Sequence, residues 1–169
     1  MAPVTSSIEV ARTPEDVWAY LDQVERHVEW QGELLESRLE TPPPVRVGSI
    51  GVERRRVPGG VRQFRYEITE HDPPRRMAFR VLNGPVRPAG AMSVAPTAGG
   101  GSRVSFDIEF HGHGLGKLLA PLASRDATKR IPEHMRRLKE RLEAEPAAAP
   151  AAPAGSGASA APAPPAEEA

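Results

Sequence analysis

The feature that most constrains the fold is a change of hydrophobic period part-way along the chain. Up to about residue 112, short segments alternate apolar and polar residues between glycine- and proline-rich turns, a pattern typical of β-strands with one buried face. From Leu115 the apolar residues recur every three to four positions, as on one face of an α-helix. The sequence therefore predicts successive hairpins followed by one long helix that packs on the sheet.

The alternation predicts an α+β fold in which a curved seven-stranded antiparallel sheet surrounds the long C-terminal helix. Two short helices follow the first strand: Thr13 is the expected N-cap of one, with Pro14 at its first position, and the other is expected over residues 24–30. The strands are expected at residues 4–10, 35–39, 45–57, 62–68, 76–81, 86–95 and 104–110.

The long helix is expected to use its whole apolar stripe against the sheet. Pro121 and Pro132 are expected to interrupt or kink it, and Glu133 with Arg137 and Lys139 with Glu143 have the spacing of helical ion pairs. The stripe consists of Leu115, Leu118, Leu119, Leu122, Ile131, Met135, Leu138 and Leu142.

Composition limits the class of protein. Lys plus Arg and Asp plus Glu both total 22, but three of the acids lie from Glu145 onward, so the remainder carries 22 − 19 = +3. This charge is too small to predict nucleic-acid binding. The absence of cysteine excludes disulfides and thiolate sites. Without a signal sequence or a long apolar span, a cytoplasmic protein without stable membrane insertion is expected.

The chain divides into two parts by composition. Residues 1–144 are predicted to form one domain. Residues 145–169 consist almost entirely of Ala, Pro, Gly and Ser, and such a segment cannot bury enough apolar surface to offset its ordering entropy. We expect a disordered tail there.

Several short motifs carry a family resemblance. Thr13-Pro14-Glu15-Asp16-Val17-Trp18 opens the first helix, Trp30 closes the second, and Gly101-Ser102-Arg103-Val104 leaves a hairpin. With these motifs the chain resembles the SRPBCC helix-grip superfamily, which includes START lipid-transfer domains and pollen-allergen-like proteins. Within it, the chain looks most like the bacterial polyketide cyclase/dehydrase group. The resemblance covers about residues 4–143 and implies either a cyclase or a carrier of hydrophobic ligands.

A curved sheet around one helix leaves space between them, which is the default place for a ligand. The expected ligand is an apolar small molecule, lipid-like or polyketide-like. No metal and no cofactor is expected, and the protein is expected to be a monomer or a homodimer. The residues expected to line the pocket are Trp30, Val52, Phe64, Tyr66, Phe79, Met92, Phe106, Ile108, Leu119 and Met135.

Three residues are candidates for acid–base chemistry. Arg62 and Tyr66 share a strand face with Phe64, so an inward Arg62 can hold a carboxylate or enolate and Tyr66 can donate to a carbonyl. The competing interpretation is an arginine that reaches water and a tyrosine in the core wall. His111, where the last strand meets the helix, is either a base at the pocket mouth or a solvated loop histidine. The Arg54-Arg55-Arg56 run reads as a charged edge strand with at least one arginine turned the other way.

Three functions remain open at this point. The first is non-catalytic binding of an apolar ligand, and the second is a cyclase or dehydrase that acts by positioning its substrate, with one acid–base group. The third is a protein-interaction module that uses the basic helix face at Arg136, Arg137 and Arg141 together with the tail.

Overall fold

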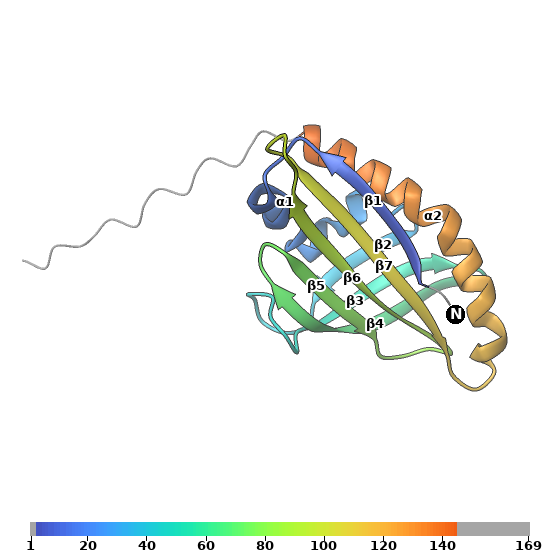
Figure 1. Ribbon diagram of the computed structural model, residues 1–169. Helices are drawn as coiled ribbons and strands as arrows, with labels where there is room; N and C mark the ends of the chain where they lie inside the picture. Colours follow the sequence, from blue (N-terminus) through green and yellow to red (C-terminus); the bar gives the residue numbers. More distant parts are fainter. Residues whose placement is uncertain (1–2, 145–169) are drawn as a thin grey trace, which may run out of the picture.

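A seven-stranded antiparallel sheet curls around a long C-terminal helix in the computed structural model, which describes residues 3–144 (Figure 1). The tail expected at residues 145–169 lies outside the described residues. The strand order is β1-β7-β6-β5-β4-β3-β2, so β1 and β2 are the edges. The elements are β1 Val4–Val10, α1 Pro14–Leu21, the 3₁₀-helix η1 Val24–Glu29, β2 Leu34–Leu39, β3 Ile50–Val57, β4 Gly60–Asp72, β5 Arg76–Val81, β6 Val86–Pro96, β7 Ser102–Gly112 and α2 Gly116–Ala144.

The fold predicted from the sequence is confirmed, with local differences. The Thr13 hydroxyl accepts a hydrogen bond from the Asp16 backbone N–H at 3.2 Å, and Pro14 opens α1. The strand expected over residues 45–57 begins only at Ile50. Before it, the chain turns so that the Arg46 backbone N–H donates to the Ser49 hydroxyl at 3.0 Å, and the local bond replaces a ladder bond.

The β3–β4 hairpin sets which side chains face the helix. Gly60, with φ of +119°, pairs with Val57 at the turn, a backbone conformation that glycine adopts without steric cost. This register places Glu53 opposite Phe64 and Gly51 opposite Tyr66. Paired residues project to the same face of a sheet, so alternate residues of β3 point toward the interior together with the aromatic residues of β4.

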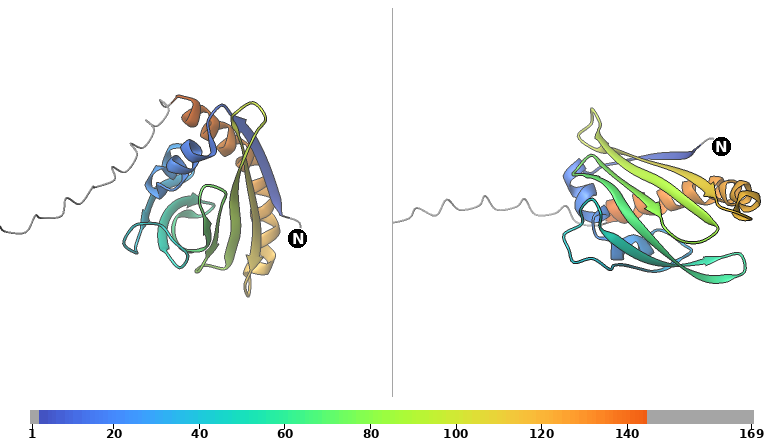
Figure 2. Two further views of the ribbon diagram at one scale, coloured as in Figure 1. Left: turned by 60° about the vertical axis from the view of Figure 1, so that its left-hand side comes forward. Right: turned by 90° about the horizontal axis from the view of Figure 1, so that it is seen from below.

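The core lies between the concave face of the sheet and the second half of α2 (Figure 2). Ile131, Met135, Leu138 and Leu142 are buried there, as the stripe predicts. The ion pairs predicted along α2 are also present, with Glu133 to Arg137 at 3.0 Å and Lys139 to Glu143 at 2.9 Å.

The first half of α2 contradicts the expectation that the whole stripe packs on the sheet. Small residues on this half are buried instead, at Gly116, Ala120 and Ala127. A Cβ at Gly116 would collide with the Pro85 backbone, so the helix approaches the β5–β6 loop more closely than a side chain allows. The leucines of this half, Leu118, Leu119 and Leu122, are exposed, as is Leu115 just before the helix.

The two prolines do not interrupt α2, which runs as one helix through Pro121 and Pro132. Both side chains are exposed.

Among the helices of residues 3–144, none is long and apolar enough to cross a membrane.

Candidate functional site

Aromatic side chains line the concave face of the central strands. Phe79 pairs with Ile68 on one side and Gly90 on the other, and Gly90 pairs with Ile108. The Phe79 ring contacts the Tyr66 ring edge-on, with 6.2 Å between the ring centroids. It stacks on the Phe106 ring, with 6.4 Å between the centroids. We call Tyr66, Phe79 and Phe106 the aromatic strip.

The concave face is not fully covered by the helix. Phe79, Phe106 and Ile108 point inward but are only partly buried. Phe64 is half-buried at the hairpin end of β4. Part of the apolar surface on this face therefore remains accessible. This surface is suited to an apolar ligand.

A cluster of polar side chains lies at one end of the aromatic strip, on the same sheet face. Arg55 projects inward from β3, and its Nε donates to the Glu53 carboxylate at 2.7 Å. Its two terminal nitrogens donate to Gln31 at 2.5 Å and to Glu33 at 3.4 Å. The other Glu33 oxygen lies 2.8 Å from Nε2 of His134 on α2. These five residues form the buried polar cluster, which joins β3, the segment before β2, and α2.

Charge pairing outweighs burial in this cluster. Burial alone would lower the pKa of Arg55, but the charge and hydrogen bond of Glu53 and the charge of Glu33 raise it. Burial would raise the pKa of Glu33, but the hydrogen bond and charge of His134, with the charge of Arg55, lower it to about 2. Arg55 and Glu33 are therefore both charged at neutral pH.

The Tyr66 hydroxyl is buried beside the Ser37 hydroxyl, whose hydrogen bonding opposes the rise in the Tyr66 pKa, but neither hydroxyl makes a well-aligned hydrogen bond within residues 3–144. Trp30 Nε1 is also buried without a partner in this part of the chain. Burial, followed by the charge of Glu53, raises the pKa of Tyr66, so its hydroxyl remains protonated and can act as a donor. An unpaired buried donor costs free energy, and a ligand that accepts its hydrogen bond recovers that cost.

The position of the Tyr66 ring depends on Gly51. A Cβ at residue 51 would lie 2.6 Å from Cε1 of the Tyr66 ring. The ring thus lies over the glycine backbone, in space that any other residue at position 51 would occupy. The pair fixes the hydroxyl beside Glu53 and Arg55, whose charges both act on it.

His27 is a further buried group near the cluster. Its Nε2 lies 2.9 Å from the Leu21 carbonyl; because a carbonyl oxygen only accepts, this nitrogen carries the proton. Burial lowers the pKa of His27, and the ring meets that of Trp30 at 5.5 Å. The contacts indicate a neutral histidine that orients the segment before β2.

An open cleft of about 590 Å³ reaches the buried polar cluster from the surface. Glu33 and His134 belong to both. The rest of the wall carries several cations from β3 and α2. The full lining is Gly32, Glu33, Arg56, Val57, Pro58, Lys129, Arg130, Glu133, His134 and Arg137.

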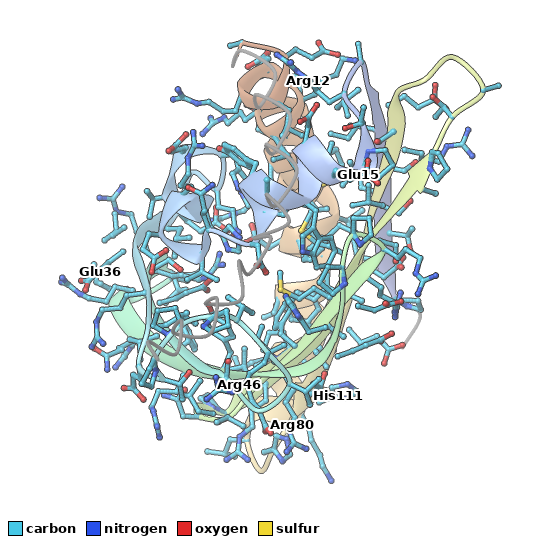
Figure 3. The ribbon with its side chains drawn as sticks, turned by 90° about the vertical axis from the view of Figure 1, so that its left-hand side faces the viewer. Arg12, Glu15, Glu36, Arg46, Arg80 and His111 are labelled. Carbon is cyan, nitrogen blue, oxygen red and sulfur yellow. The ribbon has the colours of Figure 1, made fainter. Side chains whose placement is uncertain are left out.

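Two of the predicted acid–base residues lie away from this arrangement. His111 is exposed on the same face of β7 as Glu109, whose carboxylate is 3.6 Å from its Nε2 (Figure 3). Arg62 is exposed near the β3–β4 turn, although it shares the face of Tyr66. Only Tyr66, of the three candidates, is buried at the aromatic strip.

The predicted lining residues divide in a similar way. Val52 is buried, but it pairs with Arg65 and therefore projects to the outer face, away from Tyr66. Leu119 is half-exposed on the solvent side of α2. Neither position supports contact with a ligand inside the fold. The predicted lining residues in the core are Trp30, Tyr66, Met92 and Met135, with Phe79, Phe106 and Ile108 packed against it.

The sequence reasoning missed Arg55, Glu53 and the residues that pair with them. The arginine run is expected on an edge strand, but β3 lies between β2 and β4. Arg54 and Arg56 are exposed, and Arg55 is the arginine that turns inward. The signal was the turn at Pro58-Gly59, because pairing outward from it places Arg55 and Glu53 on the face of Phe64 and Tyr66.

Within the described residues, no group of three or more His, Asp or Glu side chains is arranged to hold a metal ion.

No curated protein sequence matches the chain. Solved structures of the same fold do match. They include TTHA0849 of Thermus thermophilus (18% identity, TM-score 0.68, covering 83% of this chain and 96% of that one). A second is the Zhui aromatase/cyclase of a Streptomyces species (13% identity, TM-score 0.67, covering 83% of this chain and 93% of that one).

The crystal structure of Ara h 8.0201 also matches, at 10% identity and a TM-score of 0.63, over 83% of this chain and 96% of that one. Identities this low show the shared helix-grip fold alone. The sequence itself matches a family model over residues 1–143, nearly all of the described fold. By that match, the chain belongs to the family described as polyketide cyclase/dehydrase and lipid transport.

Proposed function

We propose that this protein binds an apolar small molecule, lipid-like or polyketide-like, between the aromatic strip and α2. The apolar part of the ligand lies against Phe79, Phe106 and Ile108, which face inward and are only partly buried. A carbonyl or hydroxyl oxygen of the ligand accepts a hydrogen bond from Tyr66. The observation that carries the proposal is the buried Tyr66 hydroxyl, which makes no well-aligned hydrogen bond in residues 3–144 and lies at the end of an apolar surface.

The experiment compares Tyr66→Phe with Tyr20→Phe, since these are the two tyrosines of the chain. Binding is measured with a polycyclic ketone and with the parent hydrocarbon that lacks the oxygen. The wild type is expected to prefer the ketone, and Tyr66→Phe is expected to lose about tenfold of that preference, the value of one hydrogen bond. Tyr20→Phe is expected to retain it, because the Tyr20 hydroxyl already donates to Glu29 at 3.1 Å.

Stability provides the second measurement on the same variants. Tyr66→Phe removes a buried hydroxyl that makes no well-aligned hydrogen bond, so the free protein is expected to be about as stable as the wild type or more so. Tyr20→Phe loses a paired hydroxyl and is expected to unfold about 1 kcal/mol more easily. Equal ketone preference in the wild type and Tyr66→Phe would contradict the proposal.

Catalysis of a cyclisation or dehydration is the second candidate function. The observation that favours it is the placement of the Glu53–Arg55 pair beside a neutral tyrosine on one sheet face. In that reaction the Tyr66 hydroxyl donates a hydrogen bond to a ligand carbonyl, Arg55 stabilises the enolate oxygen, and the Glu53 carboxylate takes the α-proton that leaves carbon. Tyr66→Phe would then reduce turnover of a poly-keto substrate by about a hundredfold or more, while binding of the parent hydrocarbon is unchanged.

A further inference from the structure

Four leucines form an exposed apolar surface where β7 passes into α2. Leu115 is 82% exposed, Leu118 76%, Leu122 63% and Leu119 47%. They occupy the β7–α2 loop and the first two turns of the helix, at the end of α2 that is remote from α1 (Figure 1). We call these four residues the leucine tip.

The leucine tip is a consequence of how α2 packs and not of local unfolding. Gly116, Ala120 and Ala127 are buried on the opposite side of the helix, toward the sheet. At 100° per residue, Leu118 and Leu122 lie on the helix face opposite Ala120 and Ala127. The close approach at Gly116 prevents the helix from rotating to bury its leucines.

Cations surround the leucine tip. Lys117 lies within it, and Arg125 and Lys129 follow on the same helix face as Leu118 and Leu122. Asp126 is the single acid between residues 111 and 132, and its carboxylate pairs with Arg130 at 2.8 Å. The apolar surface is therefore bordered by positive charge, with its one acid already paired.

We propose that the leucine tip docks on the surface of an anionic lipid bilayer. Arg125 lies seven positions after Leu118, a rise of about 10 Å along the helix, close to the depth at which amphipathic helices bury their apolar face in a membrane interface. Leucines inserted to that depth place Arg125 and Lys129 at the level of the lipid phosphates. The cleft lined by Lys129 and Arg130 begins two turns after Leu122 on the same helix. A docked protein thus brings the open end of the fold close to the bilayer.

A second copy of the chain fits this surface less well. Pairing two leucine tips would bring Lys117, Arg125 and Lys129 of each copy together without an unpaired acid on that helix segment to neutralise them. A phosphatidylglycerol surface supplies both the apolar environment and the negative charge. The docking surface is separate from the proposed ligand site, so an experiment can contradict one proposal and leave the other standing.

The test is flotation of the full chain with vesicles of phosphatidylcholine alone or mixed with phosphatidylglycerol. We expect the wild type to bind the mixed vesicles, and salt to weaken the binding. Leu118→Gln/Leu122→Gln is expected to weaken it about tenfold or more, and Arg125→Gln/Lys129→Gln is expected to weaken it on mixed vesicles. Leu35→Gln and Arg46→Gln are the matched controls, since both positions are exposed on other surfaces and should leave binding unchanged.

Three results would overturn the proposal. They are no binding of the wild type to mixed vesicles, equal binding to both vesicle types, and unchanged binding after Leu118→Gln/Leu122→Gln. Light scattering identifies the competing occupant, because a dimer that this double variant converts to a monomer, without vesicle binding, assigns the surface to a second copy. Binding of dansyl-labelled undecanoic acid without vesicles should persist in the double variant, which separates this test from that of the ligand site.

Discussion

Arg55 is the cation that neutralises the acidic side chains of the buried polar cluster. Its guanidinium lies between the carboxylates of Glu53 and Glu33 and is about one-fifth exposed. Arg55→Met keeps the apolar stem but leaves two acids without their cation. Removing one partner of a buried ion pair costs about 3 kcal/mol or more, so we expect a loss of that size in the free energy of unfolding, measured with urea.

The neighbouring arginine is the matched control for this prediction. Arg54 is half-exposed on the outer face and lies 3.3 Å from Glu36, and surface ion pairs contribute little to stability. Arg54→Met is therefore expected to change the free energy of unfolding by no more than about 0.5 kcal/mol. Equal losses in the two variants would contradict the assignment of Arg55 to the interior.

Glu33 is expected to make the free energy of unfolding fall at acid pH. Despite burial, which raises its pKa, the hydrogen bond and charge of His134 and the charge of Arg55 hold that pKa near 2, against 4.5 ordinarily. The folded chain holds this proton less tightly than the unfolded chain, so the stabilisation is complete above about pH 4.5 and is lost as the pH falls toward about 2.

Glu33→Gln is expected to flatten the fall in the free energy of unfolding between about pH 5 and about pH 3, measured by urea unfolding at each pH. Glu36→Gln, three residues later on β2 and with a half-exposed carboxylate, is the control and is expected to retain the wild-type slope. A Glu33→Gln curve parallel to that of the wild type would show that the Glu33–His134 contact does not contribute.

At the scale of elements, the cap of α1 can be tested by comparing a threonine-to-alanine substitution at the cap with the same substitution inside α2. Thr13→Ala removes the side-chain oxygen that accepts from the Asp16 N–H and is expected to cost about 1 kcal/mol. Thr128→Ala lies inside α2, where the exposed Thr128 hydroxyl donates back to the Ser124 carbonyl at 3.0 Å. Alanine favours a helix interior, so thermal unfolding is expected to shift down for Thr13→Ala and slightly up for Thr128→Ala.

The sequence predicts the elements better than it predicts which residues face the ligand space. Alternation at Phe106 and Ile108 identifies a strand, and the capping residues at Thr13 and Pro14 identify the start of α1, because both signals are local. The inward direction of Arg55 depends on pairing with β4, which is not local. For the same reason the period of α2 includes Leu118 in the stripe, although packing against the sheet buries Ala120 instead.

At the scale of the whole molecule, the fold separates three environments along one helix. The second half of α2 closes the core, its middle meets the buried polar cluster at His134, and its first turns present the leucine tip. Membership of the polyketide cyclase/dehydrase and lipid transport family fits an interior open to apolar ligands. Within that interior, a buried tyrosine lies beside an ion pair, and there we propose that a polar group of the ligand is held.

Native mass spectrometry of the freshly purified full chain shows whether the interior holds a ligand. We expect a bound small molecule that is mostly apolar and carries at least one oxygen, and we expect Tyr66→Phe to retain less of it than Tyr20→Phe. A protein that is empty in the spectrometer, and that also fails to bind dansyl-labelled undecanoic acid or anilinonaphthalene sulfonate in solution, would contradict the claim that its interior is a ligand site.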